Sequence, residues 1–391
     1  MKLTAARTRT IERPLHRAIR DYAVQLGFKD LVYLNVGEPD FPTPKHVVEA
    51  GKKAMDEGFT HYTEDRGILP LREAIAGELK KTRDIDVNPK EGILVTSGGS
   101  EALASVLLSV ADPGDDVIMP DPYYPPYVAG VRIAGGNPVP VPVNKETLQW
   151  DMEELKKAIT PKTKVIIVNS PSNPTGGVYS VELLKGIADL AADHDLYMLT
   201  DEVYDAFIYG EQGFHGVAEF DRGLERTILA NSFSKTFAMT GWRVGYIAAK
   251  PNIIADTVKV KGCINMCATS FAQKAAVVAL TSPRDCVKDM LDEYRQRRLM
   301  LLDWLKKTPE LLCSTPNGAF YAFPDASAVE KDSLEFTKYL VREAHVVVSP
   351  GVAFGAAGEG HIRISYANSR EDLNKAFRNI TDVISRYPKR K

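Results

Sequence analysis

The feature of this sequence that most restricts its fold is a series of short, unbroken apolar runs that alternate with helical patterns. The runs lie at residues 93–96, 117–119, 164–168, 196–200, 227–230 and 244–249. Strands that are apolar on both faces and are separated by helices indicate a parallel sheet covered on both sides. Polar loops follow the strand ends, where open sheets of this class bind ligands. We therefore predict an α/β fold with a mostly parallel sheet and a ligand site along one edge.

The length of the chain, 391 residues, favours two domains over one. A long charged helical pattern at 286–307 leads into a smaller α+β region. Three strand-like runs belong to that region, at 317–323, 346–348 and 360–366. We predict a large domain over residues 46–283, which holds the ligand site, and a small domain built from residues 1–45 and 284–391.

Composition excludes several classes of protein. Apolar residues make up 44% and charged residues 26%, close to globular averages, and a formal charge of -2 gives no electrostatic case for nucleic acid. No apolar run approaches the length of a membrane span, and the N-terminus lacks the hydrophobic core of a signal peptide. We therefore expect a soluble, cytoplasmic protein. A basic cluster near the N-terminus is interpreted as a solvated end or a subunit contact; its members are Arg7, Arg9, Arg13, Arg17 and Arg20.

The four cysteines are sparse, as is usual in a reducing compartment. They are Cys263, Cys267, Cys286 and Cys313. We expect Cys263 and Cys267 to share one helix face, but a structural zinc site needs four ligands and no His or Cys pair lies nearby. The sequence therefore predicts no metal site.

A polar stretch at 231–235 places Lys235 between hydroxyl side chains at the end of a predicted strand. Ser232 and Ser234 precede the lysine, and Arg243 follows eight residues later. An amine and an anion could both be held here, although a lone lysine of this kind is more often a solvated loop residue. The turn before the predicted helix at 101–111 contains Gly99 and Ser100. Its N–H groups and the helix dipole suit a phosphate, although ordinary cap chemistry explains the same residues.

Other strand-end side chains suit the same ligand. Asp201 could stay ionised against a ring N–H, while Tyr204 and Asn173 could donate to a phenolate oxygen. Tyr124, in a Pro-rich loop, offers an aromatic face for stacking. Lys235 could form an imine with an aldehyde if its amine is neutral. Taken singly, Asp201 and Tyr204 could be a helix cap and a core tyrosine, but pyridoxal 5'-phosphate is a cofactor that uses all of these groups.

Four motifs carry a resemblance to a known family. They are Asn173-Pro174-Thr175-Gly176, Asp201-x-x-Tyr204, Ser232-x-Ser234-Lys235 and Gly241-x-Arg243-x-Gly245. In this order they resemble the class I/II aminotransferases of the fold-type I pyridoxal-phosphate enzymes. The likeness extends from Gly37-Glu38-Pro39-Asp40 to Arg363-Ile364-Ser365 and so covers nearly the whole chain.

The resemblance implies a role for each matching residue. Lys235 would join the cofactor as an imine and serve as the base, Asp201 would pair with the pyridine nitrogen, and Tyr204 and Asn173 would contact the phenolic oxygen. The phosphate would be held by Gly99, Ser100, Ser232, Ser234 and Arg243, with Tyr124 stacked on the ring. Tyr62 would reach the phosphate in the neighbouring subunit of a homodimer. Gly37, Asn173 and Arg363 would bind the substrate α-carboxylate.

The implied reaction is a ping-pong exchange between an L-amino acid and a 2-oxo acid. We prefer aspartate as the donor and 2-oxoglutarate as the acceptor, with an aromatic amino acid as the alternative donor. Some bacterial aspartate enzymes of this subgroup carry a lysine where this chain has Ser100, and its absence weakens the aspartate interpretation. Two further alternatives rank lower, a pyridoxal-phosphate C–S lyase and a non-catalytic aminotransferase-like regulator.

Overall fold

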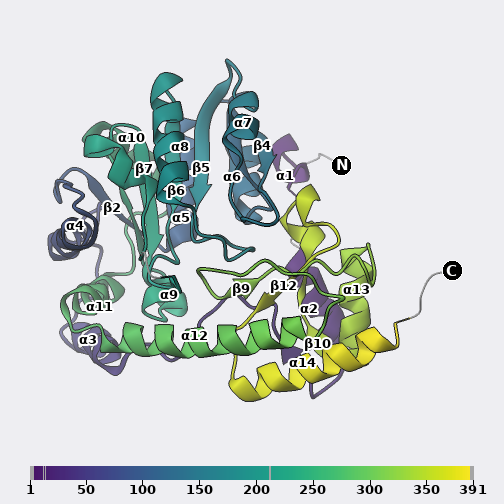
Figure 1. The fold of residues 1–391 in the computed structure, drawn as a ribbon. Coiled ribbons are helices and arrows are strands. Elements are labelled where there is room, and N and C mark those ends of the chain that lie inside the picture. The colour runs from purple at the N-terminus through teal and green to yellow at the C-terminus, as the bar shows by residue number, and fades with distance from the viewer. Residues whose placement is uncertain (1–3, 12, 14, 211–212, 388–391) are drawn as a thin grey trace.

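The computed structural model describes residues 4–11, 13, 15–210 and 213–387. Its largest sheet has seven strands in the order β2-β8-β7-β6-β5-β3-β4 (Figure 1). The strands are β2 (Ile93–Thr96), β3 (Asp116–Asp121), β4 (Asn137–Pro142), β5 (Thr163–Asn169), β6 (Tyr197–Asp201), β7 (Thr227–Ser232) and β8 (Gly245–Ala248). Neighbouring strands are parallel except that β8 runs antiparallel to β2 and to β7. The predicted α/β fold with a mostly parallel sheet is confirmed.

Two strands show how local sequence sets the order. The connection from β7 to β8 holds only the short helices α9 (Phe233–Thr236) and η3 (Thr240–Trp242), and it returns β8 antiparallel beside β7 without the longer helical crossover typical of parallel neighbours. β4 carries a proline at every second position and lies at the edge of the sheet, where a missing N–H donor costs no ladder bond.

Helices cover both faces of this sheet because its strands are apolar on both sides. Val165 and Ile167 of β5 pack in one core, and Ile166 and Val168 pack in another. The first core contains residues of α5 (Gly99–Val110), α6 (Pro126–Ala134) and α10 (Pro251–Ile264), and the second contains residues of α7 (Met152–Lys157) and α8 (Val181–Asp193). At the β2 end of the sheet α3 (Lys45–Asp56), α4 (Leu69–Arg83) and α11 (Ser270–Thr281) pack together.

The expectation that Cys263 and Cys267 share a helix face was wrong. α10 ends at Ile264, and Asn265 is extended, so Cys267 lies beyond the helix. The buried Lys261 fixes this turn, because its Nζ donates to the carbonyls of Asn265 at 3.0 Å and Met266 at 3.3 Å. The described residues contain no group of three or more His, Cys, Asp or Glu that could hold a metal, and no described helix is long and apolar enough to cross a bilayer.

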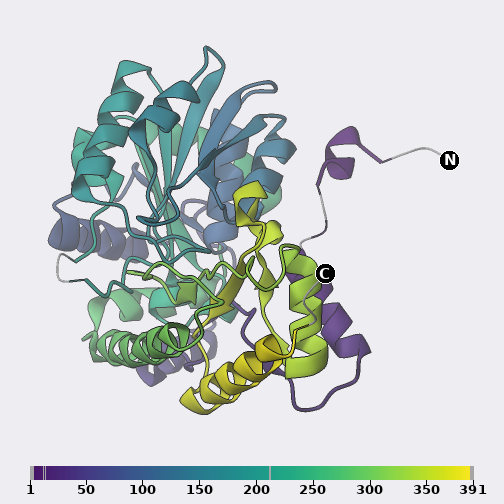
Figure 2. The ribbon, with the colours of Figure 1, turned by 45° about the vertical axis from the view of Figure 1, so that its right-hand side comes forward.

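Segments from the two ends of the chain form a second unit beside the sheet (Figures 1 and 2). β1 (Val32–Tyr33) pairs in parallel with β10 (Val346–Val347), while β12 (Ile362–Ser365) pairs with β9 (Tyr321–Ala322) and β11 (Ser349–Pro350). The remaining helices of this unit are α2 (Leu15–Gln25), α13 (Ser333–Tyr339), η4 (Leu340–Ala344), η5 (Gly351–Phe354), η6 (Ala356–Gly358) and α14 (Arg370–Ser385). The long α12 (Asp285–Lys306) runs beneath both units in Figure 1. The domain boundaries at residues 46 and 283 stay a prediction.

Three short helices complete the described chain. α1 (Ala6–Arg9) contacts α6, whereas η1 (Val217–Phe220) and η2 (Arg222–Leu224) precede β7.

Candidate active site

A cavity of about 740 Å³ lies where the carboxyl ends of β5, β6 and β7 face the second unit. Twelve of the thirteen predicted site residues line it. They are Gly37, Gly99, Ser100, Tyr124, Asn173, Asp201, Tyr204, Ser232, Ser234, Lys235, Arg243 and Arg363. The fold therefore brings together residues that are scattered over more than three hundred positions, and Tyr62 alone of the predicted set lies outside the cavity lining.

Lys235 lies in the one-turn helix α9 and not in the loop that we predict. The turn forms because the Ser232 Oγ accepts a hydrogen bond from the Ser234 N–H at 3.1 Å, a cap at the end of β7. The Lys235 Nζ donates to the carbonyl of Gly37 at 2.5 Å. Burial, opposed by the charge on Glu38 and assisted by that on Arg363, lowers the pKa of Lys235 to about 8. A substantial fraction of this amine is therefore neutral near pH 8.

Asp201 ends β6 and is buried, with 3% of its surface exposed. The hydroxyl of Tyr127 donates to its Oδ2 at 2.7 Å. Burial raises the pKa of Asp201, whereas the Tyr127 bond and the charge on Lys235 lower it. No sequence pattern assigned a role to Tyr127, one of several tyrosines in a Pro-rich stretch. Only the tertiary fold brings the start of α6 to the carboxylate at the end of β6.

A second pair of tyrosines joins the two units. The hydroxyls of Tyr204 and Tyr321 lie 2.7 Å apart, and both side chains are buried. Tyr321 also stacks beneath Arg363, whose guanidinium carbon lies 4.5 Å from the ring centre. Tyr321 was missed from the sequence, although its place in the strand-like run at 317–323 offered a signal. Tyr321 therefore contacts both Tyr204, which we expect at the cofactor, and Arg363, which we expect at the substrate.

Arg363 is held in place without a carboxylate partner among the described residues. Its Nη1 donates to Asn173 Oδ1 at 3.0 Å, and its Nη2 donates to the carbonyl of Asn35 at 2.6 Å. Only 6% of Arg363 is exposed, and its Nε has no hydrogen-bond partner within the described chain. A buried, incompletely satisfied guanidinium is a strong site for a carboxylate, which would accept two parallel hydrogen bonds.

Hydroxyls, an arginine and a helix start meet at another corner of the cavity. Gly98 caps α5 with a φ of +83°, and a Cβ there would lie 2.5 Å from the Arg243 Nη2. Only glycine allows both this backbone and this approach. The Oγ atoms of Ser232 and Ser234 lie 2.8 Å apart, and the Gly99 position faces Ser232. Free N–H groups, hydroxyls and a guanidinium in one corner suit a phosphate.

Tyr124 also lines the cavity and is half-buried. Its ring meets that of Tyr127 edge to face, with the centroids 5.5 Å apart. Burial and the nearby charge of Asp201 raise the pKa of Tyr124 to about 12, so its hydroxyl stays protonated at neutral pH. The ring is thus fixed beside Asp201, where a planar ligand would pack.

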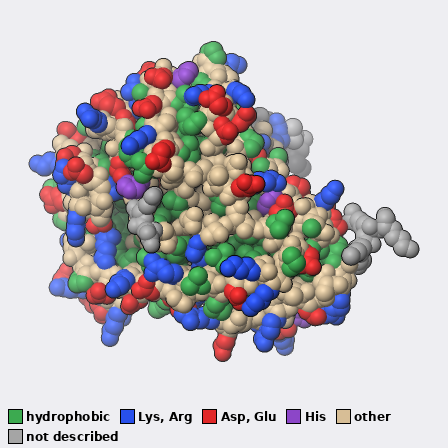
Figure 3. All heavy atoms as spheres, viewed as in Figure 1, with side chains coloured by type: hydrophobic (Ala, Val, Ile, Leu, Met, Phe, Trp, Pro, Cys, Tyr) green, Lys and Arg blue, Asp and Glu red, His purple; other side chains and the backbone are tan. Residues whose placement is uncertain are grey.

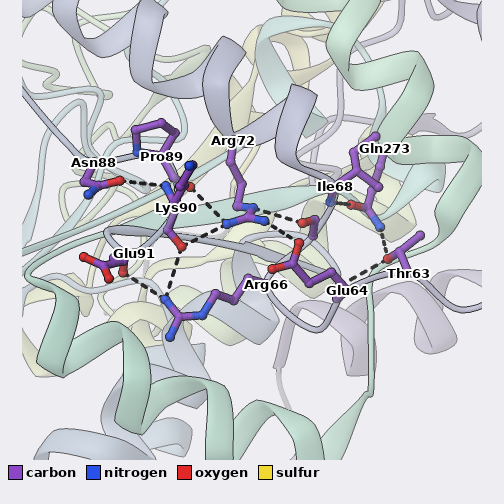
Figure 4. A network of polar contacts seen from close by, with 11 residues as sticks. Thr63, Glu64, Arg66, Ile68, Arg72, Asn88, Pro89, Lys90, Glu91 and Gln273 are labelled. Atoms are coloured by element: carbon purple, nitrogen blue, oxygen red, sulfur yellow. Dashed lines mark hydrogen bonds and ion pairs between the residues drawn. The ribbon is translucent and has the colours of Figure 1, made fainter.

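Tyr62 lies outside the cavity, with 80% of its surface exposed. Polar contacts hold the segment that follows it (Figure 4). Arg72 pairs with Glu64 at 2.5 Å, and Gln273 donates to the Thr63 Oγ1 at 3.0 Å. A large aromatic side chain therefore projects from a well-anchored segment without covering any described part of its own chain.

The chain is similar to known proteins over most of its length. The family model for aminotransferase class I and II matches residues 29–380. An aspartate aminotransferase of Pyrococcus abyssi is 43% identical over 93% of this chain and 94% of its own. An aromatic-amino-acid aminotransferase of Thermococcus litoralis is 42% identical over 92% of each chain. The structure of an aspartate aminotransferase from Thermus thermophilus with maleate superposes with a TM-score of 0.93, at 38% identity, over 98% of this chain and 100% of that one.

The fold and the site thus define an α/β enzyme in which a buried amine of lowered pKa shares a cavity with several guanidinium groups. The chain belongs to the aminotransferase class I and II family.

Proposed function

We propose that this aminotransferase moves an amino group between L-aspartate and 2-oxoglutarate in a ping-pong reaction, with pyridoxal 5'-phosphate as its cofactor. One observation carries the proposal. Lys235, an amine whose pKa is lowered to about 8, shares a cavity with the buried carboxylate of Asp201 and the buried guanidinium of Arg363. An amine base, a ring-nitrogen partner and a carboxylate clamp are the groups that amino-group transfer requires.

The residues fit this cofactor by their chemistry. We assign the phosphate to the corner formed by Gly99, Ser100, Ser232, Ser234 and Arg243, and the ring to the space beside Tyr124. Asp201 would pair with the pyridine nitrogen, and Tyr204 and Asn173 would donate to the phenolic oxygen. When bound, the cofactor supplies a ring that accepts negative charge from the substrate Cα.

Lys235 supplies the proton transfer in this scheme. Its amine is neutral in part because burial disfavours the ammonium form. We propose that Nζ takes the proton from the substrate Cα and would deliver it to the C4' carbon of the cofactor on the same face. Gly37, whose carbonyl now accepts from Nζ, lies where the freed amine and the substrate meet.

Arg363 orients the substrate. Its fork would bind the α-carboxylate, with Asn173 and the backbone of Gly37 completing the contact. Because Asn173 and Asn35 fix the guanidinium before any substrate arrives, little side-chain entropy is lost on binding.

The choice of aspartate rests on charge. The relatives include enzymes named for aspartate and for aromatic amino acids at almost equal identity, so identity alone does not separate the two. The Thermus thermophilus enzyme was solved with maleate, a dicarboxylate. The cavity of this chain has more basic than acidic lining residues, which favours a substrate with a second carboxylate. An aromatic donor remains the second candidate, favoured by the Thermococcus litoralis relative.

We also propose a homodimer with composite sites. The exposed ring of Tyr62 on its anchored segment supports a role across a subunit boundary, at the phosphate of the neighbouring cofactor. Sedimentation of the holoenzyme, together with loss of cofactor affinity in Tyr62→Phe, tests this arrangement; a monomer with full activity would contradict it.

A screen of half-reactions tests the proposed function. The enzyme is loaded with pyridoxal 5'-phosphate and mixed rapidly with single amino acids while the cofactor absorbance is followed. Aspartate and glutamate are expected to react fast, and phenylalanine and tyrosine slowly. The reverse order would establish the aromatic alternative, and release of pyruvate and ammonia without an acceptor would establish a lyase.

A further inference from the structure

Basic residues outnumber acidic ones around the cavity. The basic lining residues are Arg13, Arg17, Arg20, Arg132, Lys235, Arg243 and Arg363, and the acidic ones are Glu38 and Asp201. On the face drawn in Figure 3, by contrast, basic and acidic side chains are interspersed. The proposed function uses Lys235, Arg243 and Arg363 and leaves four arginines at the cavity without a role.

Two of these four arginines already have partners. Arg13 pairs with Asp21. Arg132 of α6 donates to the carbonyl of Thr10 at 2.6 Å and so holds the N-terminal segment against the large sheet unit. Both side chains are therefore engaged in holding the segment that passes the cavity.

Arg17 and Arg20 differ from these. Both are exposed, and neither makes an ion pair or hydrogen bond to any residue that the structure describes. They lie three positions apart on α2, so their side chains leave the same face of the helix. Two guanidinium groups side by side without a counter-charge repel each other, and an anion between them would relieve that repulsion.

The position of α2 links this pair to the substrate clamp. α2 packs against β11 and β10, beside α13 in the view of Figure 2. In β11, Ser349 lies directly opposite Arg363 of β12, and the Arg363 Nη2 is 3.5 Å from the Ser349 Oγ. The helix that carries Arg17 and Arg20 is therefore the next element beyond the strand pair that carries the proposed α-carboxylate site.

We propose that Arg17 and Arg20 bind the distal carboxylate of a dicarboxylic substrate, an inference that rests on the proposed function. A guanidinium fork suits a carboxylate, and the excess of positive charge at the cavity raises the local concentration of a dianion. This assignment replaces the interpretation of these two arginines as a solvated surface.

The test compares two substrates in the loaded enzyme. Arg17→Gln, Arg20→Gln and the double variant are expected to lower the second-order rate constant of the aspartate half-reaction by about 10- to 100-fold, the worth of a hydrogen bond to a charged group. The same constant for phenylalanine should stay within about twofold, since its side chain brings no second carboxylate. Arg378→Gln is the matched control, because Arg378 is an exposed arginine on α14 outside the cavity lining.

A binding measurement separates this inference from the proposed reaction. Titration calorimetry with maleate, which carries no amino group to transfer, should show a weaker Kd in the double variant and no change in Arg378→Gln. Equal losses for aspartate and phenylalanine would overturn the inference by showing that the arginines only support the fold. Unchanged aspartate and maleate constants would overturn it as well. If the unmodified enzyme reacts with no amino acid yet its maleate affinity depends on Arg17 and Arg20, the proposed function fails and the dicarboxylate site stands.

Discussion

The Tyr127 hydroxyl donates to Asp201 Oδ2 across 2.7 Å, so a residue at the start of α6 holds the buried carboxylate at the end of β6. The carboxylate is costly to keep ionised in a buried site, and this bond is one of the few interactions that favour its charged form. If Asp201 pairs with the pyridine nitrogen of the cofactor, Tyr127 acts through it as a positioning residue.

Replacing Tyr127 with Phe is expected to weaken cofactor binding about tenfold at neutral pH, the worth of one hydrogen bond to a charged group. In the unmodified enzyme the hydrogen bond from Tyr127 lowers the pKa of Asp201, so Tyr127→Phe should raise that pKa. The loss of cofactor affinity should therefore grow as the pH falls and Asp201 becomes protonated. Fluorescence titration with pyridoxal 5'-phosphate at several pH values measures both effects. Tyr179→Phe, a change to a buried tyrosine outside the cavity lining, is the control. An affinity equal to that of the unmodified enzyme at every pH would refute the positioning role.

Replacing Lys235 with Ala is expected to lower turnover by about a thousandfold or more, because under the proposed function it removes both the nucleophilic amine and the base. The absorbance band that marks a covalent bond between lysine and cofactor should disappear as well. Lys288→Ala removes an exposed lysine of α12 and should leave both intact. Survival of the band and of turnover in Lys235→Ala would show that another group carries the chemistry.

The pH dependence of cofactor capture follows from the pKa of Lys235. Burial places this pKa at about 8, so the neutral, reactive amine increases as the pH rises through that value. The rate of covalent capture is expected to rise over the same range and then level off. Glu38 raises the pKa of Lys235, and Glu38→Gln should therefore move the midpoint to lower pH. Glu310→Gln removes an exposed carboxylate elsewhere and should leave the midpoint in place; a midpoint that stays unchanged in Glu38→Gln contradicts the electrostatic account.

Gly98 offers a test of the phosphate corner. Alanine at this position would have to adopt a φ of +83° and would press its Cβ against Arg243, so Gly98→Ala should destabilise the fold by about 1–2 kcal/mol and weaken cofactor binding. Gly77→Ala lies within α4 and meets open space, so it should instead stabilise the fold by about 0.5–1 kcal/mol. Urea unfolding and cofactor titration of the two variants measure the contrast. A Gly98→Ala protein as stable and as tightly bound as the original would count against a strained, closely packed turn.

Sequence patterns predicted the strands and their ends well because these depend on local properties. Continuous apolar runs indicate strands buried on both faces, and Gly, Pro and polar residues mark where they stop. Lys235, Asp201 and Asn173 could be proposed as site residues for this reason, since each lies at or just after the carboxyl end of a strand. The error at Cys267 shows the limit of local reasoning, because α10 ends at Ile264, where the buried side chain of Lys261 bonds to the carbonyl of Asn265.

By itself, the sequence determined which elements form and which chemical groups stand at their ends. The tertiary structure decided which of those groups meet. Tyr127 and Asp201 are 74 positions apart, Tyr204 and Tyr321 117 apart, and Asn173 and Arg363 190 apart. These pairings depend on the strand order and on the packing of the second unit against the sheet. The lowered pKa of Lys235 has the same origin, because desolvation of an amine arises only when distant segments close around it.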